Sequence, residues 1–359
     1  RPVETVLSGP AASLSGAAFL AGSKSALVAD IGGTTTDIAF LNNGTPRLKK
    51  DGAFVGGWQT MVEAAEIRTC GLGGDSEVTP LLRSRSGGLT LGPRRAMPLS
   101  LLALSWPKIK DHLKAQLALA VPMVTDARFV FPIMPDGIPQ WLTRSEIRLA
   151  EKAIARGPVQ IADIATTQLA LGAVDRLISR GLLVLCSFTP TDAAHVIGKF
   201  NEFDRDAALL GAKLLARQRN GSGNNIANTP YLLAEMTLAE LYRRSALALM
   251  DAAFAHEDGN EAAISCNPIL SHSFGPQKPA GSLISIGMTL NTDLVALGAS
   301  ATTHYPPITD VIGAKLTVPN HADVAGPIGA AVGSVRQRVM ISITQPAEAK
   351  FRVHLPDGP

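Results

Sequence analysis

Small polar residues lie between two apolar runs in the segment ALVADIGGTTTDIAFL, residues 26–41. Two adjacent glycines let backbone N–H groups approach a phosphate closely, because no Cβ stands in the way. Threonine hydroxyls add hydrogen-bond donors, and the flanking aspartates offer carboxylates to a hydrated Mg²⁺, which typically takes one or two of them. The pattern therefore predicts a phosphate-binding loop. Its candidate residues are Asp30, Gly32, Gly33, Thr34, Thr35, Thr36 and Asp37.

Two common nucleotide-binding motifs are missing from the sequence. The Walker A pattern GxxxxGK[ST] occurs nowhere, and the residues after Gly33 continue as a strand, whereas a Rossmann fingerprint opens a helix there. A plain β-hairpin with a Gly-Gly turn is the alternative interpretation of the same residues. In either case we expect strand, tight turn and strand, with a second turn at Asn43-Gly44, a dipeptide that favours hairpin loops.

Composition narrows the class of protein. The chain has 359 residues and is 46% hydrophobic, which is ample for a large core. Only 18% of residues are charged and the net charge is +3, so no broad basic surface indicates nucleic acid or an anionic membrane as a partner. No apolar run reaches the roughly 20 residues of a membrane helix. The three cysteines, Cys70, Cys186 and Cys266, lack metal-ligand spacing and favour a reducing compartment, so we expect a cytoplasmic protein.

Strands and helices alternate towards both ends of the chain, which indicates an α/β fold. Residues 9–22 have the alanine and glycine content of a closely packed helix, and residues 68–78 form a second glycine-rich loop. Residues 83–96 give no clear element. The elements expected in the last third are strands at 282–287, 293–301 and 315–319, and helices at 306–313 and 323–339.

A different pattern fills residues 108–260, which are mostly helical in period and poor in glycine, and we expect an inserted subdomain there. Within it, residues 145–189 give three short helices and a strand, an order that resembles a winged helix. A DNA-reading version needs several basic and amide side chains on its third helix. Residues 168–180 are too poor in such residues, so we expect no nucleic-acid partner. The polar residues of that segment are Gln168, Asp175, Arg176, Ser179 and Arg180.

The segment SFTPTDAAHVIG carries the signature of a helix start. Thr189 is the expected N-cap, Pro190 falls in the first turn, and Asp192 follows three residues after the cap. His195 has no second metal-type residue at a helical spacing, so we interpret it as a core or capping partner. A long amphipathic helix is expected over residues 231–256.

Several separated segments together resemble one protein family. DIGGTTTDIAFL is similar to the phosphate loop of the superfamily that unites actin, hexokinase and the heat-shock chaperone ATPases. The segments VETVLSGPAAS, RTCGLGGDSEV, SFTPTDAAHVIG, LVALGASATTHYPPI and VPNHADVAGPIGAAVG follow the order of the central region of the hydantoinase A/5-oxoprolinase family. That family includes a subunit of acetone and acetophenone carboxylases. The resemblance covers nearly the whole chain, and the preserved order makes it more specific than any single loop.

The resemblance implies a fold and a set of site residues. The fold would be α/β, a ribonuclease H-like (actin-like ATPase) domain made of residues 1–107 and 261–359 and interrupted by the winged-helix-like insertion. Asp30 to Asp37 would hold the outer phosphates of ATP with Mg²⁺, with Asp30 as the metal ligand and both aspartates as catalytic groups. Two more groups would face the same cleft: a neighbouring loop of Gly71, Gly73, Gly74, Asp75 and Ser76, and an adenosine turn of Gly298, Ala299 and Ala301.

The sequence also departs from the family pattern. Family members carry another DxGGTxTD loop in an N-terminal half and continue beyond the point where this chain stops, so we expect a fragment that binds ATP poorly alone and does not turn it over. The helix after the adenosine turn reads AGPIGAA where the family has Asn-Ala. Its small residues, Gly329, Ala330 and Gly333, are expected to allow tight packing.

The activity that the resemblance implies is that of an ATP-dependent amidohydrolase, which opens a hydantoin, N-methylhydantoin or 5-oxoproline ring by phosphorylating the carbonyl oxygen. The implied partners are this small cyclic amide, a second hydantoinase-type (B) subunit and further copies of the chain in an oligomer. Two alternatives stay open. One is the ATPase subunit of an acetone- or acetophenone-type carboxylase, and the other is a non-catalytic regulator that uses the winged-helix-like segment.

Overall fold

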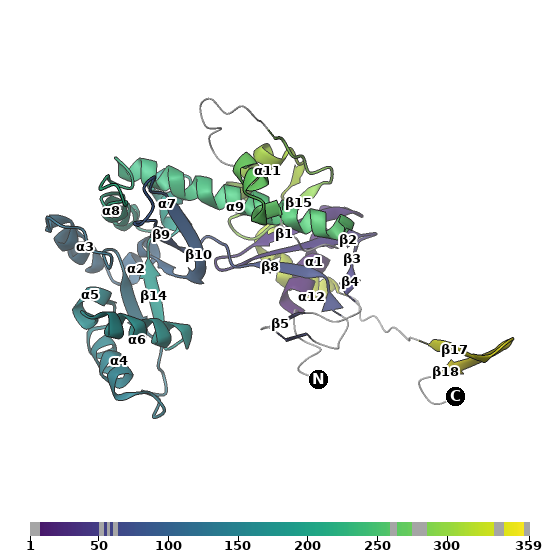
Figure 1. Cartoon of the computed structure of the whole chain (residues 1–359), viewed down its shortest axis with the longest axis horizontal. Helices are drawn as coiled ribbons and strands as arrows, with labels where there is room; N and C mark the ends of the chain where they lie inside the picture. Colours follow the sequence, from purple (N-terminus) through teal and green to yellow (C-terminus); the bar gives the residue numbers. More distant parts are fainter. Residues whose placement is uncertain are drawn as a thin grey trace.

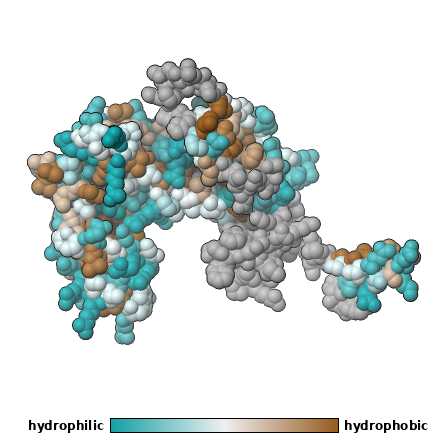
Figure 2. Space-filling view, in the orientation of Figure 1, coloured by the Kyte–Doolittle hydropathy of each residue, from teal (hydrophilic) through white to brown (hydrophobic). Residues whose placement is uncertain are grey.

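The computed structural model describes residues 8–49, 54–55, 58–59, 64–258, 264–274, 286–333 and 341–354. Most of the predicted strand at 282–287 lies outside these residues, as does the predicted helix beyond Gly333. In the described part of the chain, no helix is long and apolar enough to cross a membrane. Figure 2 shows hydrophobic residues singly or in small groups among hydrophilic ones on the face it presents.

The main sheet contains the predicted phosphate loop between its two central strands, β1 (Ala26–Ile31) and β2 (Thr36–Asn42). These strands pair antiparallel with Asp30 opposite Asp37, which confirms the predicted strand–turn–strand. The second predicted turn is also present, since Asn43 and Gly44 both have positive φ and lead into β3 (Thr45–Pro46). Strand β8 (Ile67–Cys70) pairs with the start of β2, next to β3 at its end.

The other edge of the sheet comes from the last third of the chain. Strand β15 (Leu294–Leu297) runs parallel to β1, and β16 (Leu316–Thr317) runs parallel to β15. The strand order is therefore β16-β15-β1-β2, followed by β3 and β8. Because β1 and β15 are parallel, their carboxyl ends meet at one edge, and the loops that follow them lie close together.

Helices cover both faces of this sheet, as the alternation of side chains along β1 requires. Ala26 and Val28 point towards α1 (Ser8–Ala21) and α12 (Ala325–Val332), whereas Leu27 and Ala29 point towards α9 (Pro230–Asp258) and α11 (Ala301–Ile312). The predicted helix at 9–22 is thus confirmed. The whole arrangement is visible in the right half of Figure 1.

Two predictions for the last third need correction at their boundaries. The expected strand 293–301 ends at Leu297, because Gly298 adopts a φ of 103° and turns the chain. The expected helix 306–313 begins earlier, at Ala301, and continues through Pro306 and Pro307. Proline is typical of a first helical turn, which is why the sequence placed the helix start too late.

A second group of elements packs around the strand pair β9 (Ser76–Pro80) and β10 (Leu89–Arg95). Its helices are α2 (Leu99–Ser105), α3 (Ile109–Ala118), α7 (Pro190–Val196) and α8 (Arg205–Ala216), and its core extends from Leu72 to Leu241. Strand β10 lies within residues 83–96, for which the sequence predicted no element. This core crosses position 107, where we predicted the start of the insertion; the domain limits themselves stay a prediction.

The winged-helix-like segment contributes β13 and β14 to a four-stranded sheet covered by helices, and β11 and β12 come from earlier in the chain. The order is β11-β14-β12-β13, and the three predicted helices and the strand at 145–189 are all present. Arg176 and Arg180 of the third helix both contact the buried Glu146, at 2.9 and 3.1 Å. The elements are β11 (Met97–Pro98), β12 (Phe129–Pro132), α4 (Arg144–Arg156), β13 (Val159–Gln160), α5 (Ile161–Ile164), α6 (Gln168–Ser179) and β14 (Leu183–Ser187).

Helix α9 joins the two halves. Figure 1 shows α9 running across the top of the molecule from the second group to the main sheet, with the hairpin β17–β18 apart from both. The remaining elements are β4 (Leu48–Lys49), β5 (Phe54–Val55), β6 (Trp58–Gln59), β7 (Ala64–Ala65), η2 (Ile264–Cys266), α10 (Pro268–Ser273), η3 (Ala322–Val324), β17 (Ser342–Ala347) and β18 (Lys350–His354).

Candidate functional site

Three loops that are far apart in the sequence meet around one cavity of about 530 Å³. They follow β1, β8 and β15, and the first and third leave the same edge of the main sheet because their strands are parallel. The start of α7 and the segment after it complete the wall. Seven of the predicted site residues line this cavity: Asp30, Gly32, Gly33, Gly74, Asp75, Gly298 and Ala299.

The phosphate loop is a tight turn fixed by hydrogen bonds at its base. The Gly32 N–H donates to the Thr35 carbonyl at 2.8 Å, and the buried Thr36 hydroxyl donates to the Leu72 carbonyl at 2.8 Å. In the described part of the chain, the backbone N–H groups of Gly33 and Thr34 make no hydrogen bond. The loop is therefore fixed at its base, and its tip keeps free donors of the kind that bind phosphate.

The second glycine-rich loop lies directly against the first. The Asp75 N–H donates to the Gly33 carbonyl at 2.7 Å, and the Gly74 N–H donates to the Gly32 carbonyl at 3.3 Å. A Cβ on Gly73 would overlap the carbonyl oxygens of Gly32 and Gly33. Glycine at position 73 is thus required by this close approach of two backbones, and Gly73 itself is buried beneath the cavity.

The third loop closes on the end of β1. Gly298 turns with its φ of 103°, its N–H donates to the Ala322 carbonyl at 3.0 Å, and a Cβ there would overlap the Ile31 carbonyl. The same Cβ would lie 3.4 Å from Asp30 Oδ1, so the turn runs beside the Asp30 carboxylate. Ala301 is completely buried at the start of α11 and does not line the cavity.

The wall opposite the phosphate loop is formed by α7 and the residues after it. The predicted capping box is confirmed, with Thr189 as N-cap, Pro190 in the first turn and Asp192 as its partner. Thr191 donates to the Gly74 carbonyl through both its N–H and its hydroxyl, each at 2.9 Å. Helix α7 is therefore joined to the second loop.

His195 has the structural role that we predicted for it. Its ring is fully buried, its Nδ1 lies 2.8 Å from the Thr191 carbonyl, and its Nε2 accepts a hydrogen bond from the Phe203 N–H at 3.0 Å. The ring stacks on Phe203 and meets the edge of Phe200. Both phenylalanines line the cavity, so His195 positions an aromatic part of its wall.

Two of the aspartates have carboxyl groups that hold a proton more strongly than usual. Burial raises the pKa of Asp75, although the nearby guanidinium of Arg95, at 3.1 Å, acts in the opposite direction. Burial also raises the pKa of Asp37, against the effect of a 2.6 Å hydrogen bond from the Thr69 hydroxyl, and the Asp30 charge adds to the rise. Asp37 is thus tied to β8 and does not line the cavity.

The remaining predicted residues support the loops from outside the cavity. Thr34 and Thr35 form the turn itself, and Thr36 is bonded beneath it. A Cβ on Gly71 would lie 3.3 Å from the Pro93 side chain, and the Ser76 hydroxyl accepts a hydrogen bond from the Gly73 N–H at 3.0 Å. The roles that we assigned to individual residues stay predictions.

Sequence reasoning missed a further group of residues on the cavity wall. Thr303 and His304 follow Ser300 at helical spacing on α11, so periodicity counted from the predicted adenosine turn would have found them. Thr191 lies in SFTPTDAAHVIG and Asp323 in VPNHADVAGPIGAAVG, but neither was predicted as a site residue. The missed residues are Pro98, Leu101, Thr191, Ala194, Phe200, Glu202, Phe203, Ser300, Thr303, His304 and Asp323.

His304 is a buried histidine that stays neutral. Only 3% of it is exposed, and burial, together with the charge of Lys199, lowers its pKa from 6.5 to about 4. Its Nδ1 atom has no hydrogen-bond partner in the described residues. An uncharged imidazole can either donate or accept, so His304 offers the cavity a polar group without a charge.

This lowered pKa predicts a pH dependence of folding stability. The unfolded chain protonates His304 near pH 6.5 and the folded chain only near pH 4, so stability is complete above this window and falls as the pH drops through it. A His304→Phe variant should lack this component in urea unfolding curves measured at pH values across the window. The exposed His354→Gln variant should keep it, and an unchanged curve for His304→Phe would contradict the assignment.

The carboxylates of the site suit Mg²⁺ better than a metal held by protein ligands alone. Among the described residues, no group of three or more His, Cys, Asp or Glu side chains is placed to hold a metal ion. Mg²⁺ usually keeps several waters and binds through one or two carboxylates together with substrate phosphates. Asp30 at the cavity edge, beside the free N–H groups of the phosphate loop, fits that donor set.

Part of the chain is similar to a known protein family. Residues 1–175 match the family model described as Hydantoinase/oxoprolinase, and no curated protein is significantly similar in sequence. A nucleotide-free structure of acetone carboxylase, titled for the mechanism of ATP-dependent acetone carboxylation, matches with 13% identity and a TM-score of 0.48 over 93% of this chain and 33% of its own.

An ATP-dependent caprolactamase from Pseudomonas jessenii matches with 15% identity and a TM-score of 0.42, over 89% of this chain and 32% of its own. The chain thus spans about a third of the length of these solved structures. The hydantoinase/oxoprolinase family is thus the family whose model residues 1–175 of this chain match.

Proposed function

We propose that this chain forms the ATP-binding part of an ATP-dependent enzyme that opens a small cyclic amide. The observation that carries the proposal is the meeting of three glycine-containing loops around one cavity. The match of residues 1–175 to the hydantoinase/oxoprolinase family model supports the same function. The chain would supply the nucleotide site, and the ring would be a hydantoin, an N-methylhydantoin or 5-oxoproline.

The strand order of the main sheet supports a ribonuclease H-like, actin-like ATPase fold. An antiparallel meander is followed by two strands parallel to its first strand, and the loops at the carboxyl ends of β1 and β15 face one cavity. In this arrangement, the turn after β1 would hold phosphates and the turn after β15 would approach the adenosine. Gly298 and Ala299 have little or no side chain there, which leaves room for a purine.

The chain's own groups would act by positioning and by charge. The free N–H groups of Gly33 and Thr34 would donate to phosphate oxygens, and the Asp75 backbone would keep the second loop against them. Asp30 would hold Mg²⁺, which when bound neutralises charge on the phosphates. Phosphoryl transfer needs little covalent chemistry from the protein, so such positioning accounts for most of the catalysis.

The reaction would activate the ring carbonyl. The terminal phosphoryl group of ATP would pass to the amide oxygen, water would then add to the carbon, and ring opening would release phosphate. The proposal needs no serine or cysteine nucleophile. Cys70, the cysteine nearest the loops, has its pKa raised by burial, which disfavours a reactive thiolate. A second hydantoinase-type (B) subunit and an oligomeric assembly are part of the proposal.

The test begins with binding of Mg-ATP to the 359-residue chain, measured by titration calorimetry. We expect weak binding and no turnover by the chain alone. Asp30→Asn should weaken binding of Mg-ATP by at least about tenfold, since it removes a charged ligand, while metal-free ATP should bind equally to both proteins. Asp310→Asn, at an exposed position of α11, is the matched control.

Turnover is tested with the full-length protein that carries this chain, together with its B-type partner subunit. ATP hydrolysis should rise when hydantoin or 5-oxoproline is added, and Asp30→Asn should lower it by at least about a hundredfold. If no cyclic amide stimulates hydrolysis, the proposed substrate class is wrong. Dependence on bicarbonate and a ketone would instead identify the carboxylase-type alternative.

A further inference from the structure

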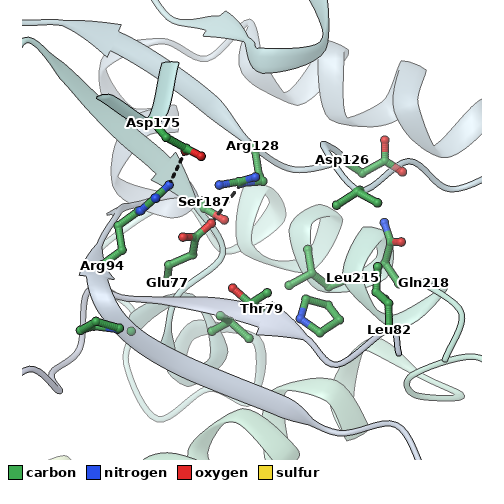
Figure 3. Close-up of a pocket in the computed structure, with 15 residues that line it drawn as sticks. Glu77, Thr79, Leu82, Arg94, Asp126, Arg128, Asp175, Ser187, Leu215 and Gln218 are labelled. Atoms are coloured by element: carbon green, nitrogen blue, oxygen red, sulfur yellow. Dashed lines mark hydrogen bonds and ion pairs between the residues drawn. The ribbon is translucent and has the colours of Figure 1, made fainter. Parts of the chain in front are cut away.

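A second cavity, of about 430 Å³, is lined by residues of the β9–β10 strand pair. Its walls come from β9, β10, the loop at 124–128, β14 and α8, and Figure 3 shows Glu77, Ser187 and Arg128 in the middle of the view, between the Arg94–Asp175 pair and Asp126 with Gln218. None of its lining residues also lines the first cavity. Its size falls within the range of pockets that bind small molecules.

Arg128 is the unusual group in this cavity. Its Nε lies 3.0 Å from Glu77 Oε1, but the N–H does not point along that line, so the contact is an ion pair without an aligned hydrogen bond. Within the described residues, its terminal Nη atoms also have no hydrogen-bond partner. The Arg128 side chain is only 23% exposed, and that of Glu77 only 10%. A largely buried guanidinium whose donors no protein group accepts must be satisfied by water or by a ligand in the cavity.

The other charges around the cavity have partners of their own. Arg94 Nη1 donates to Asp175 at 2.7 Å, and Asp126 accepts from Arg217 at 3.0 Å and from the Met123 N–H. These charged groups are therefore already paired within the protein. The unused donors belong to Arg128, next to the hydroxyl of the buried Ser187.

We propose that this cavity binds a small organic carboxylate, with its two oxygens held by the Arg128 guanidinium. The planar fork of arginine matches a carboxylate, which it binds through two parallel N–H···O bonds. The remaining wall is largely apolar, from Val78, Pro80, Leu82 and Leu215, and suits a short hydrocarbon body. The nearby Glu77 charge reduces the net positive potential, which favours a single negative charge over a more highly charged phosphate.

This site is separate from the first cavity but close to it in sequence. Glu77 follows Asp75 by two residues on the way into β9, and Arg95, the partner of Asp75, is the chain neighbour of Arg94. A carboxylate bound to Arg128 would thus lie beside Glu77, two residues after Asp75, whose N–H bonds to the phosphate loop. The binding proposal does not depend on whether the first cavity binds ATP.

Titration calorimetry with butyrate, butyramide and inorganic phosphate tests the proposal on the whole chain. Butyrate should bind with a Kd of about millimolar, as expected for so small a ligand, and butyramide, which has the same shape and no charge, should bind at least about tenfold more weakly. Arg128→Gln should abolish butyrate binding. Arg148→Gln, which removes an exposed arginine of α4, should leave it unchanged.

Glu77→Gln provides a second, independent test, because Arg128→Gln leaves Glu77 without its partner and could impair folding. Removing the Glu77 charge should tighten butyrate binding several-fold, whereas an ion pair with only a structural role predicts no gain. Circular dichroism establishes that each variant is folded. The proposal is overturned if butyrate fails to bind the folded parent chain, if butyramide binds equally well, if folded Arg128→Gln keeps its affinity, or if phosphate alone shows Arg128-dependent binding.

Discussion

Replacing Gly329 by alanine is expected to destabilise the main sheet's helical layer by about 3 kcal/mol, at the upper end of typical overpacking costs. A Cβ at this position would overlap the Ala12 carbonyl of α1 and lie 2.6 Å from the Gly16 N. Both are backbone atoms, so neither can move aside without shifting a helix. A Cβ on Gly16 would in turn overlap the Ala325 carbonyl, so the two helices meet through glycines on both sides.

Gly326→Ala is the matched control in the same helix. Its Cβ would meet only the Ser13 hydroxyl, at 3.4 Å, and alanine has a higher helix propensity than glycine by about 1 kcal/mol. The control should therefore be neutral or stabilising. Urea unfolding followed by circular dichroism measures both variants. Equal unfolding midpoints for the two would show that the α1–α12 contact is looser than the structure indicates.

Replacing Asp192 by alanine should cost about 4 kcal/mol, because the change leaves several buried donors without an acceptor. Asp192 is fully buried, and its two carboxylate oxygens accept from the N–H groups of Leu99, Ser100 and Thr189 at 3.1, 2.8 and 3.0 Å. Burial raises the pKa of this carboxyl, while these N–H donors act to lower it. One side chain thus joins the first turns of α2 and α7.

The effect of this change should reach the first cavity. Helix α2 contributes Leu101 and α7 contributes Thr191 and Ala194 to its wall, so loss of the junction should weaken nucleotide binding together with stability. Thr167→Ala is the control, because in the described residues the Thr167 side chain caps only α6, by accepting from the Ala170 N–H at 3.2 Å, and such a cap is worth about 1 kcal/mol. If both variants lose the same amount of unfolding free energy, Asp192 contributes no more than a single helix N-cap.

Local signals in the sequence were sufficient for the elements that depend on neighbouring residues. The β1–β2 hairpin, the Asn43-Gly44 turn and the Thr189 capping box all arise from contacts within a few residues, and all three are confirmed. Strand β10 was not foreseen, because its alternation is limited to Leu89-Thr90-Leu91 before Gly92-Pro93, and its pairing with β9 is needed to form the strand. The predicted start of α11 was too late, because its two prolines locally resemble a first helical turn although they lie inside the helix.

The candidate site, too, could be predicted from the sequence only in part. The glycines of three loops could be recognised in the sequence, but their meeting depends on the parallel pairing of β1 with β15, between residues far apart in the chain. Phe200 and Phe203 reach the wall through contacts with a buried histidine, and no local spacing reveals that. Arg128 likewise gains its unused donors only from the tertiary arrangement around it.

Helix α9 also determines how the two halves of the molecule can move. Leu233, Leu238 and Leu241 near its start belong to one core, and Ala246 and Leu249 further along belong to the other. After Pro230 the helix contains neither glycine nor proline, the residues at which long helices usually kink. A hinge between the cores would have to bend an unbroken helix, so we expect the two cores to move together as one rigid body.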